Sequence, residues 1–205
     1  YREIYKKEGI NKKAKYNIEW ILQEYINNPF LIKGKKFNLR VNFIHDFSNK
    51  KYYIYNNLQL YPAKNKYKKG DYKDKNIHDT GHTLEILNNL FIFPNEFNKI
   101  ISKEKITNIM KQITEIFKGV SKVMKVQCYS ESKNCFHLFG ADIMITDDYK
   151  VKLIEINQKP GLGLPNNYKY ILYDLFENIM EKIVDKHFPP SKKVKALNNL
   201  IDVTP

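Results

Sequence analysis

Phe139-Gly140-Ala141-Asp142-Ile143-Met144, followed after a short break by Lys152-Leu153-Ile154-Glu155-Ile156-Asn157, is the clearest structural signal in this chain. Both segments are mainly apolar, and the residues between them, Thr146-Asp147-Asp148-Tyr149-Lys150, are typical of a turn. The pattern predicts two strands, over 135–144 and 151–157, that pair as a hairpin.

The expected hairpin carries three polar side chains in otherwise apolar surroundings. Glu155 and Asn157 are two positions apart and project from the same face of their strand, while Asp142 lies on the neighbouring strand. Two carboxylates and an amide offer the hard oxygen ligands that suit magnesium, which keeps other positions for water and phosphate. The sequence therefore indicates a magnesium site. The alternative is that the three residues lie on a half-exposed outer surface.

A third strand is predicted over 37–44, where apolar and polar residues alternate. Lys36, Asn38 and Arg40 fall on the face opposite the apolar one. An arginine in line with a lysine on one strand suits an oxyanion such as a transferring phosphoryl group. A solvated outer face is the alternative for this stretch alone.

The rest of the chain completes an α+β pattern. Two long amphipathic helices are predicted, because apolar residues recur at helical spacing over 97–125 and 168–187. We expect further strands over 17–26 and 52–61, a polar loop over 62–83 of the kind that is often functional or mobile, and a weakly patterned tail over 191–205. The predicted fold is a largely antiparallel sheet backed by the two helices.

Composition restricts the classes of function. The 205 residues are 42% hydrophobic and 28% charged, which is ordinary for a globular protein, and no apolar run approaches the roughly 18 residues that a membrane-spanning helix needs. The formal net charge of +13 favours an acidic partner. Part of this charge can also reflect A/T-rich codons. A nucleic-acid binder is a weaker alternative, because arginine occurs only at Arg2 and Arg40.

Cellular context is predicted from the cysteines and the start of the chain. Cys128 and Cys135 form no disulfide framework, are weak as a zinc site, and are expected to be small buried or half-buried thiols. No secretory leader opens the chain, so we expect a cytoplasmic protein. The missing initiator Met leads us to expect a fragment or a processed piece. A nucleotide would bind without a P-loop or a Rossmann turn, since neither motif occurs.

Four motifs, in this order, resemble those of the tubulin–tyrosine ligase-like family, whose members are ATP-grasp enzymes that add amino acids to protein carboxylates. They are Gln23-x-Tyr25-Ile26-x-Asn28-Pro29-Phe30-Leu31-Ile32-x-Gly34-x-Lys36-Phe37-Asn38-Leu39-Arg40, His78-x-Thr80, Phe136-x-Leu138-Phe139-Gly140-Ala141-Asp142, and Leu153-Ile154-Glu155-Ile156-Asn157-x-x-Pro160. The resemblance covers about residues 17–190. The Asn-Pro-Phe-Leu-Ile wording is more similar to the glutamylase branch than to the tyrosine ligase.

The resemblance implies a role for each matched residue. Gln23, Tyr25 and Ile26 would form the hinge that lines the adenine pocket. Lys36 and Arg40 would contact phosphate and acyl phosphate, and Asn38 would keep a ligand contact only as a neutral amide. His78 and Thr80 would lie near nucleotide and substrate. Asp142, Glu155 and Asn157 would be the magnesium ligands.

The resemblance also implies an organisation. Residues 1–26 would be the end of the central ATP-grasp subdomain with its hinge, 27–190 the C-terminal subdomain, and 191–205 a tail. The family's N-terminal lobe, which carries the lysines that grip the triphosphate, is not in this chain. Three departures from the family pattern stand at Asn38 in place of Asp, at Tyr61 near an expected Arg, and at Gly81 in place of Asn.

The function implied is an ATP- and magnesium-dependent ligase that joins a free amino acid (glutamate, glycine or tyrosine) to a protein carboxylate through an acyl phosphate. An acidic tail such as that of tubulin would be the acceptor, polyglutamylation an example of the modification, and the cytoskeleton a place of association. The three departures motivate a different alternative. In it, the chain is an inactive ATP-grasp pseudo-enzyme that binds acidic tails or cytoskeletal polymer.

Overall fold

In a computed structural model, the described residues are 23–80, 92–129, 134–163, 169–192 and 196–205. They form one 7-stranded sheet in which every strand pair is antiparallel. The strands are β1 (Phe37–Asp46), β2 (Lys51–Tyr55), β3 (Leu58–Pro62), β4 (Ile92–Phe93), β5 (Phe136–Ile145), β6 (Val151–Asn157) and β7 (Leu200–Asp202). The predicted class, a largely antiparallel α+β sheet with long helices, is confirmed.

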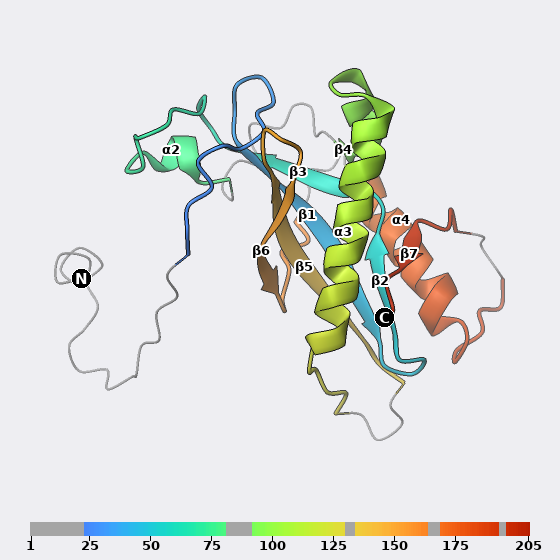
Figure 1. The fold of residues 1–205 in the computed structure, drawn as a ribbon. Coiled ribbons are helices and arrows are strands. Elements are labelled where there is room, and N and C mark those ends of the chain that lie inside the picture. The colour runs from blue at the N-terminus through green and yellow to red at the C-terminus, as the bar shows by residue number, and fades with distance from the viewer. Residues whose placement is uncertain (1–22, 81–91, 130–133, 164–168, 193–195) are drawn as a thin grey trace, which may run out of the picture.

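The strand β1 is the centre of the sheet (Figure 1). Along one edge it pairs with β5, from Leu39 opposite Ile143 to Asp46 opposite Phe136. Along its other edge it pairs first with β3 and then with β2. β6 lies outside β5, β4 outside β3 and β7 outside β2, so β1 places its side chains between those of both neighbours.

The two long helices cover opposite faces of the sheet (Figure 1). The helix α3 (Lys103–Val123) begins at Ser102, whose side chain accepts a hydrogen bond from the Lys105 amide. It buries one apolar stripe, made by Ile106, Ile109, Ile113 and Phe117, against the core residues of β1. The helix α4 (Lys169–Ile179), continued by the π-helical turn η4 (Met180–Val184), packs on Ile44, Tyr53 and Tyr55. The short elements are α2 (Lys75–His78) and the 3-10 helix η2 (Asn95–Lys99).

Three predicted segments differ in the structure. The expected strand over 52–61 is two strands, because the chain bends at Asn56 and Asn57 and β2 and β3 pair with different parts of β1. The weakly patterned tail contributes β7, which extends the sheet beyond β2. Of the strand expected over 17–26, residues 23–26 are not in a strand and 17–22 lie outside the described residues.

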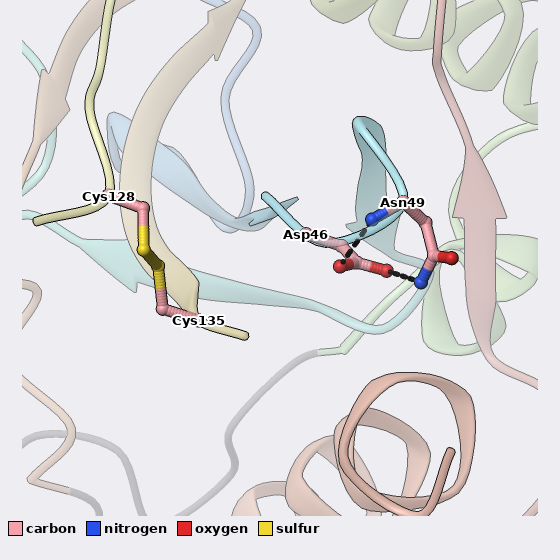
Figure 2. The surroundings of a disulfide bond; sticks show 4 residues. All are labelled: Asp46, Asn49, Cys128 and Cys135. Carbon is pink, nitrogen blue, oxygen red and sulfur yellow. Dashed lines mark hydrogen bonds between the residues drawn. A yellow bond between two sulfur atoms is a disulfide. The ribbon is translucent and has the colours of Figure 1, made fainter. Parts of the chain in front are cut away.

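The expectation that the two cysteines form no disulfide is wrong: Cys128 and Cys135 are bonded, with their Cα atoms 6.4 Å apart (Figure 2). The bond joins the segment after α3 to the start of β5, and it lies beside the turn that follows β1. In that turn, Asp46 accepts hydrogen bonds from the backbone and side-chain nitrogens of Asn49 at 3.2 and 2.7 Å. Sequence spacing did not reveal the pairing, because a separation of seven residues does not by itself bring two cysteines within bonding distance.

Among the described residues, no helix is both long enough and apolar enough to cross a membrane.

Candidate functional site

A row of polar side chains crosses four strands on one face of the sheet. Arg40 of β1 lies opposite Gln59 of β3 on one side and opposite Asp142 of β5 on the other, and Asp142 lies opposite Glu155 of β6. Directly opposite residues share a face of the sheet. We call this surface, defined by Gln59, Arg40, Asp142 and Glu155, the site face. It brings together the two features that sequence analysis placed on separate strands.

Arg40 and Asp142 form a bidentate ion pair. The guanidinium donates from Nε to Oδ1 at 2.6 Å and from Nη2 to Oδ2 at 3.2 Å, and the two side chains are only 16% and 14% exposed. Burial lowers the pKa of Arg40, but the hydrogen bond and charge of Asp142 outweigh burial and hold that pKa above its ordinary value. Arg40 is therefore a fixed cation at the centre of the site face.

Glu155 and Asn157 extend the site face to solvent at β6. The Asn157 amide nitrogen donates to Glu155 Oε1 at 2.9 Å, which leaves the amide oxygen of Asn157 available as a ligand. In the described part of the chain, no group of three or more His, Cys, Asp or Glu side chains is arranged for a metal. The candidate set is therefore two carboxylates and one amide. These donors fit magnesium, which takes few protein ligands and completes its shell with water and phosphate.

Gly140 makes room for Arg40 on β5. A Cβ at this position would lie 2.6 Å from Cβ of Pro160 and 2.9 Å from Nη1 of Arg40. Only glycine therefore allows the loop after β6 and the arginine side chain to approach β5 together. Sequence reasoning did not assign a role to this residue, although a glycine inside an apolar strand is a signal of close approach.

A second cluster forms around Lys36, directly before β1. The Tyr25 hydroxyl and His78 Nδ1 are 2.5 Å apart, and Lys36 Nζ donates to the His78 carbonyl at 3.0 Å and to the Tyr25 hydroxyl at 3.3 Å. Lys36 is 7% exposed. Burial lowers its pKa, against the opposing charge of Asp79, and burial with two neighbouring tyrosines raises the pKa of Tyr25 to about 12. Three predicted nucleotide contacts thus touch one another.

Thr80, the other member of the His78 motif, is buried but makes no hydrogen bond to the Lys36 cluster or to the site face among the described residues. Gly81, one of the three departures from the family pattern, lies outside the described residues.

The polar loop after β3 is attached to the Lys36 cluster. The hydroxyls of Tyr67 and Tyr72 donate to the carbonyl and side-chain oxygens of Asn27 at 3.0 and 2.6 Å, and both rings pack against His78. Sequence analysis missed these tyrosines. The lysines of this segment are exposed: Lys64, Lys66, Lys68, Lys69, Lys73 and Lys75. We call residues 62–76 the lysine loop.

A hollow of about 410 Å³ lies beside Tyr25, between the segment 23–28 and β6. It brings the predicted hinge residues Gln23, Tyr25 and Ile26 together. Its other wall was not predicted and comes from Thr146 and from residues 152–154 of β6. The strand β6 therefore contributes its first half to the hollow and its second half to the site face.

The departures at Asn38 and Tyr61 lie opposite each other on β1 and β3. The Tyr61 ring lies 5.5 Å from the guanidinium carbon of Arg40, and its hydroxyl donates to Gln59 Oε1 at 3.1 Å. The Oδ1 atom of Asn38 is buried without a hydrogen-bond partner. Both departures therefore belong to the site face, where they replace charged groups with neutral ones.

Comparison with known proteins finds relatives that are described as tubulin glycylases and tubulin polyglutamylases. The chain is 25% identical over 194 residues to "Tubulin glycylase 3C" of Tetrahymena thermophila, which is 86% of this chain and 18% of the relative. It is 27% identical over 202 residues to "Tubulin glycylase 3D" of the same organism, and 26% identical over 167 residues to "Probable tubulin polyglutamylase TTLL9" of Bos taurus. The last two matches take in 87% and 75% of this chain but 19% and 36% of those relatives. The chain thus spans well under half the length of these three proteins.

A solved structure shares the fold. The C-terminal domain of Pby1 from K. lactis, described as an ATP-grasp enzyme that interacts with the mRNA decapping enzyme Dcp2, matches with a TM-score of 0.67 and 22% identity. The match covers 88% of this chain and 51% of that one. The fold is therefore that of an ATP-grasp domain. The sequence pattern of the Tubulin-tyrosine ligase family matches residues 4–196, and the chain belongs to that family.

Proposed function

We propose that this chain is the C-terminal ATP-grasp part of an ATP-dependent ligase that joins an amino acid to a protein carboxylate. One observation carries the proposal: Asp142 and Glu155 are direct partners across β5 and β6, with Asn157 beside them and Arg40 bound to Asp142. Two carboxylates, an amide and a cation on one surface support phosphoryl transfer, because they would hold magnesium and offset phosphate charge together.

Each part of the site has a role in this reaction. The hollow at Gln23–Asn28 would hold the adenine, and Lys36 would contact the phosphates from beside the hollow. Asp142, Glu155 and Asn157 would hold magnesium, which, when bound, offsets the negative charge of the phosphates. Arg40 would face the acceptor, whose carboxylate oxygen attacks the γ-phosphorus of ATP while the bond to the bridging oxygen breaks and ADP leaves. The amine of the amino acid then attacks the acyl carbon, phosphate leaves, and the nitrogen loses a proton as the amide forms.

The organisation proposed from the sequence also applies here: 1–26 as the end of the central subdomain with its hinge, 27–190 as the C-terminal subdomain and 191–205 as a tail. Because the chain covers only part of its relatives, the lysines that grip the triphosphate would belong to another part of the full-length protein. We infer that the complete ATP site forms only there.

The acceptor would be an acidic protein tail. The names of the relatives point to tubulin, and the net charge of +13 would attract a Glu-rich chain over long range. The lysine loop is exposed and attached to the Lys36 cluster, so its cations would lie near the proposed nucleotide contacts. An acceptor on tubulin would make this a cytoskeleton-associated protein.

A second candidate is an inactive pseudo-enzyme that binds acidic tails or cytoskeletal polymer. It is favoured by two neutral residues on the site face: Tyr61 lies near an expected Arg and lowers the positive charge available to a substrate, and Asn38, in place of Asp, removes an anionic ligand. The retained set of Asp142, Glu155 and Asn157 favours the ligase.

The test is Glu155→Gln in the full-length protein. Glu155 is exposed and forms no ion pair with a described residue, so this change removes a metal ligand while it preserves shape and packing. ATP-dependent incorporation of labelled amino acid into a Glu-rich peptide should fall to background, with the unfolding midpoint unchanged. Asp142→Asn should also abolish turnover, but it breaks the Arg40 pair as well. Near-wild-type incorporation by Glu155→Gln would show that the magnesium site is misassigned. A wild-type protein that binds the peptide without modifying it would support the pseudo-enzyme.

A further inference from the structure

The helix α4 and its continuation η4 carry two apolar stripes. The inner stripe, which includes Ile171, Leu175 and Ile179, is buried against β1, β2 and β7. The outer stripe includes Tyr173 and Met180, which are seven positions apart and therefore share one face of the helix, but they are 64% and 43% exposed. A surface helix needs only one apolar stripe, because its other face meets water. A second stripe that faces solvent indicates an interaction surface.

A hollow of about 420 Å³ follows the outer stripe. Phe176, which is partly buried against the core, lines it together with Tyr173 and Met180. Both Tyr173 and Asp185 line the hollow, and twelve helical positions correspond to roughly 18 Å along the axis. The hollow is therefore elongated along the helix. We call it the α4 groove, which is defined by these lining residues: Tyr173, Phe176, Glu177, Met180, Glu181 and Asp185.

The α4 groove is acidic in a basic protein. Its three carboxylates, from Glu177, Glu181 and Asp185, are accompanied by one lining cation, Lys192. In the part of the chain that the structure describes, none of the three carboxylates belongs to an ion pair. Glu181 accepts a hydrogen bond from the backbone of Ala196 at 3.0 Å through Oε2. Because the whole chain has a formal net charge of +13, the groove is a local exception that favours a cationic partner.

The π-helical turn η4 brings the third carboxylate into the groove. The backbone N–H of Asp185 donates to the carbonyl of Met180, five residues earlier, at 2.8 Å. In a regular α-helix, the residue one turn beyond Met180 is Val184, and the wider turn puts Asp185 there instead. Single π-helical turns of this kind are frequent at functional sites. Here the turn places a carboxylate where the sequence of a regular helix would place an apolar side chain.

We propose that the α4 groove is a docking surface for a basic amphipathic helix of a partner protein. The apolar residues of that helix would pack on Tyr173, Phe176 and Met180, and its lysines or arginines would lie beside the three carboxylates. The length of the groove matches about three turns of a helix, which present apolar anchors at i, i+3 or i+4, and i+7. A wholly apolar partner is disfavoured, because it would remove the carboxylates from water without pairing them.

Docking in the α4 groove is independent of the proposed ligase. The groove shares no residue with the site face, the Lys36 cluster or the hollow at Gln23–Asn28. In Figure 1, α4 lies beside β2 and β7, whereas the metal ligands proposed above belong to β5 and β6. A partner could therefore bind here while the proposed active site remains open.

The experiment uses the full-length protein and a fluorescein-labelled peptide of about 18 residues, designed as a helix with leucines on one face and lysines beside them. Fluorescence anisotropy would measure its binding. Wild type should bind this peptide with a stoichiometry near one, and roughly tenfold more tightly than a scrambled peptide of the same composition. Added salt should weaken the binding, because the carboxylates contribute to it.

Two variants test the apolar and the acidic part of the groove separately. Tyr173→Ala should weaken binding roughly tenfold, and Tyr129→Ala, at a tyrosine that is 92% exposed, is its matched control. The double change of Glu177 and Asp185 to Lys should weaken binding and flatten its salt dependence. The same change of Glu104 and Glu115 to Lys, on the exposed face of α3, alters the net charge equally and should have a smaller effect.

Several outcomes would overturn the docking surface. They are absent binding by wild type, unchanged binding in Tyr173→Ala, and an equal loss in the two charge variants, which would show that net charge alone attracts the peptide. A peptide with a central proline that binds as well as the helix would show that the groove takes an extended chain. Self-association of wild type that Tyr173→Ala abolishes, measured by sedimentation velocity, would assign the groove to a second copy of this protein.

Discussion

Arg40 and Asp142 lie opposite each other on β1 and β5, and two hydrogen bonds at 2.6 and 3.2 Å join the guanidinium to the carboxylate. The pair links the cation proposed to contact phosphate with the first proposed magnesium ligand. Neither can shift without the other, so the geometry of metal and phosphate binding depends on one partly buried ion pair.

Arg40→Lys should show how far this geometry depends on the guanidinium. A lysine keeps the charge but cannot form the two-point contact with Asp142. We expect ligase turnover to fall on the order of a hundredfold, with a loss of about 1–3 kcal/mol in unfolding free energy. Urea titration and single-turnover assays would measure both. The exposed pair Lys51–Asp202 is the control, since Lys51→Ala should leave the urea unfolding midpoint close to that of wild type. Wild-type turnover in Arg40→Lys would contradict the role given to the pair.

Gly140→Ala tests the close approach at β5. The added methyl would meet Pro160 and Arg40, and we expect a loss of about 1–3 kcal/mol of stability together with reduced activity. Gly119→Ala is the matched control, because a Cβ there has nothing within 4 Å and the position is inside α3. That change should stabilise the protein by about 0.5–1 kcal/mol. Thermal unfolding of the two variants should therefore move in opposite directions, and a shift in the same direction would count against the packing described.

His45 should make stability depend on pH. It is buried between Phe47 and Tyr52, and burial lowers its pKa below 6.5; Asp46 opposes this shift and His137 adds to it. Since the unfolded chain then takes up the proton at a higher pH than the folded protein, stability should fall as pH drops below about 6.5 and level off below the folded pKa. His45→Phe should flatten this part of the profile. Urea titrations at pH 7.5, 6.5 and 5.5 would measure the unfolding free energy of both proteins. An equal change of this free energy with pH in wild type and His45→Phe would contradict the prediction.

Residues 1–205 alone should bind MgATP much more weakly than the full-length protein. The hollow at Gln23–Asn28 and the site face supply contacts to the adenine and the metal, but the triphosphate would lack the cations of the remaining lobe. Calorimetry on both proteins would decide this. Micromolar binding by residues 1–205 at a stoichiometry near one would show that the site is self-sufficient.

Charge reversal tests whether the lysine loop is the surface that binds the acceptor. Lys64, Lys66, Lys68 and Lys69 changed to Glu should weaken binding of a Glu-rich peptide and flatten its salt dependence, because these exposed cations lie next to the Lys36 cluster. The same change in charge at Lys103, Lys111, Lys122 and Lys125, on and after α3, is the control. If both variants weaken binding equally, net charge rather than the loop attracts the peptide.

The sequence predicted the features that depend on local alternation. The β5–β6 hairpin and the outward face of Lys36, Asn38 and Arg40 follow from a period of two, and their motifs led to the family. Residues that matter only through distant pairing were not found. Gln59 lies in the strand predicted over 52–61, but the chain bends at Asn56 and Asn57 and β3 pairs separately with the start of β1, so the register that places Gln59 opposite Arg40 could not be predicted. Tyr67 and Tyr72 lie in a segment without any period, and their role depends on Asn27, far away in sequence. The strand β7 was missed for the same reason, because its partner β2 is distant in the sequence, whereas the disulfide was missed because a spacing of seven residues does not by itself indicate a bond.

The hydroxyls of Tyr67 and Tyr72, which donate to Asn27, connect two segments to which different functions are proposed. Asn27 lines the hollow proposed for adenine, while the tyrosines belong to the loop proposed to receive the acceptor. If an acidic chain displaces the lysine loop on binding, the two hydrogen bonds would transmit that displacement to Asn27 and thus to the hollow proposed for adenine. Binding of one substrate would then alter the affinity for the other by the same factor in both directions.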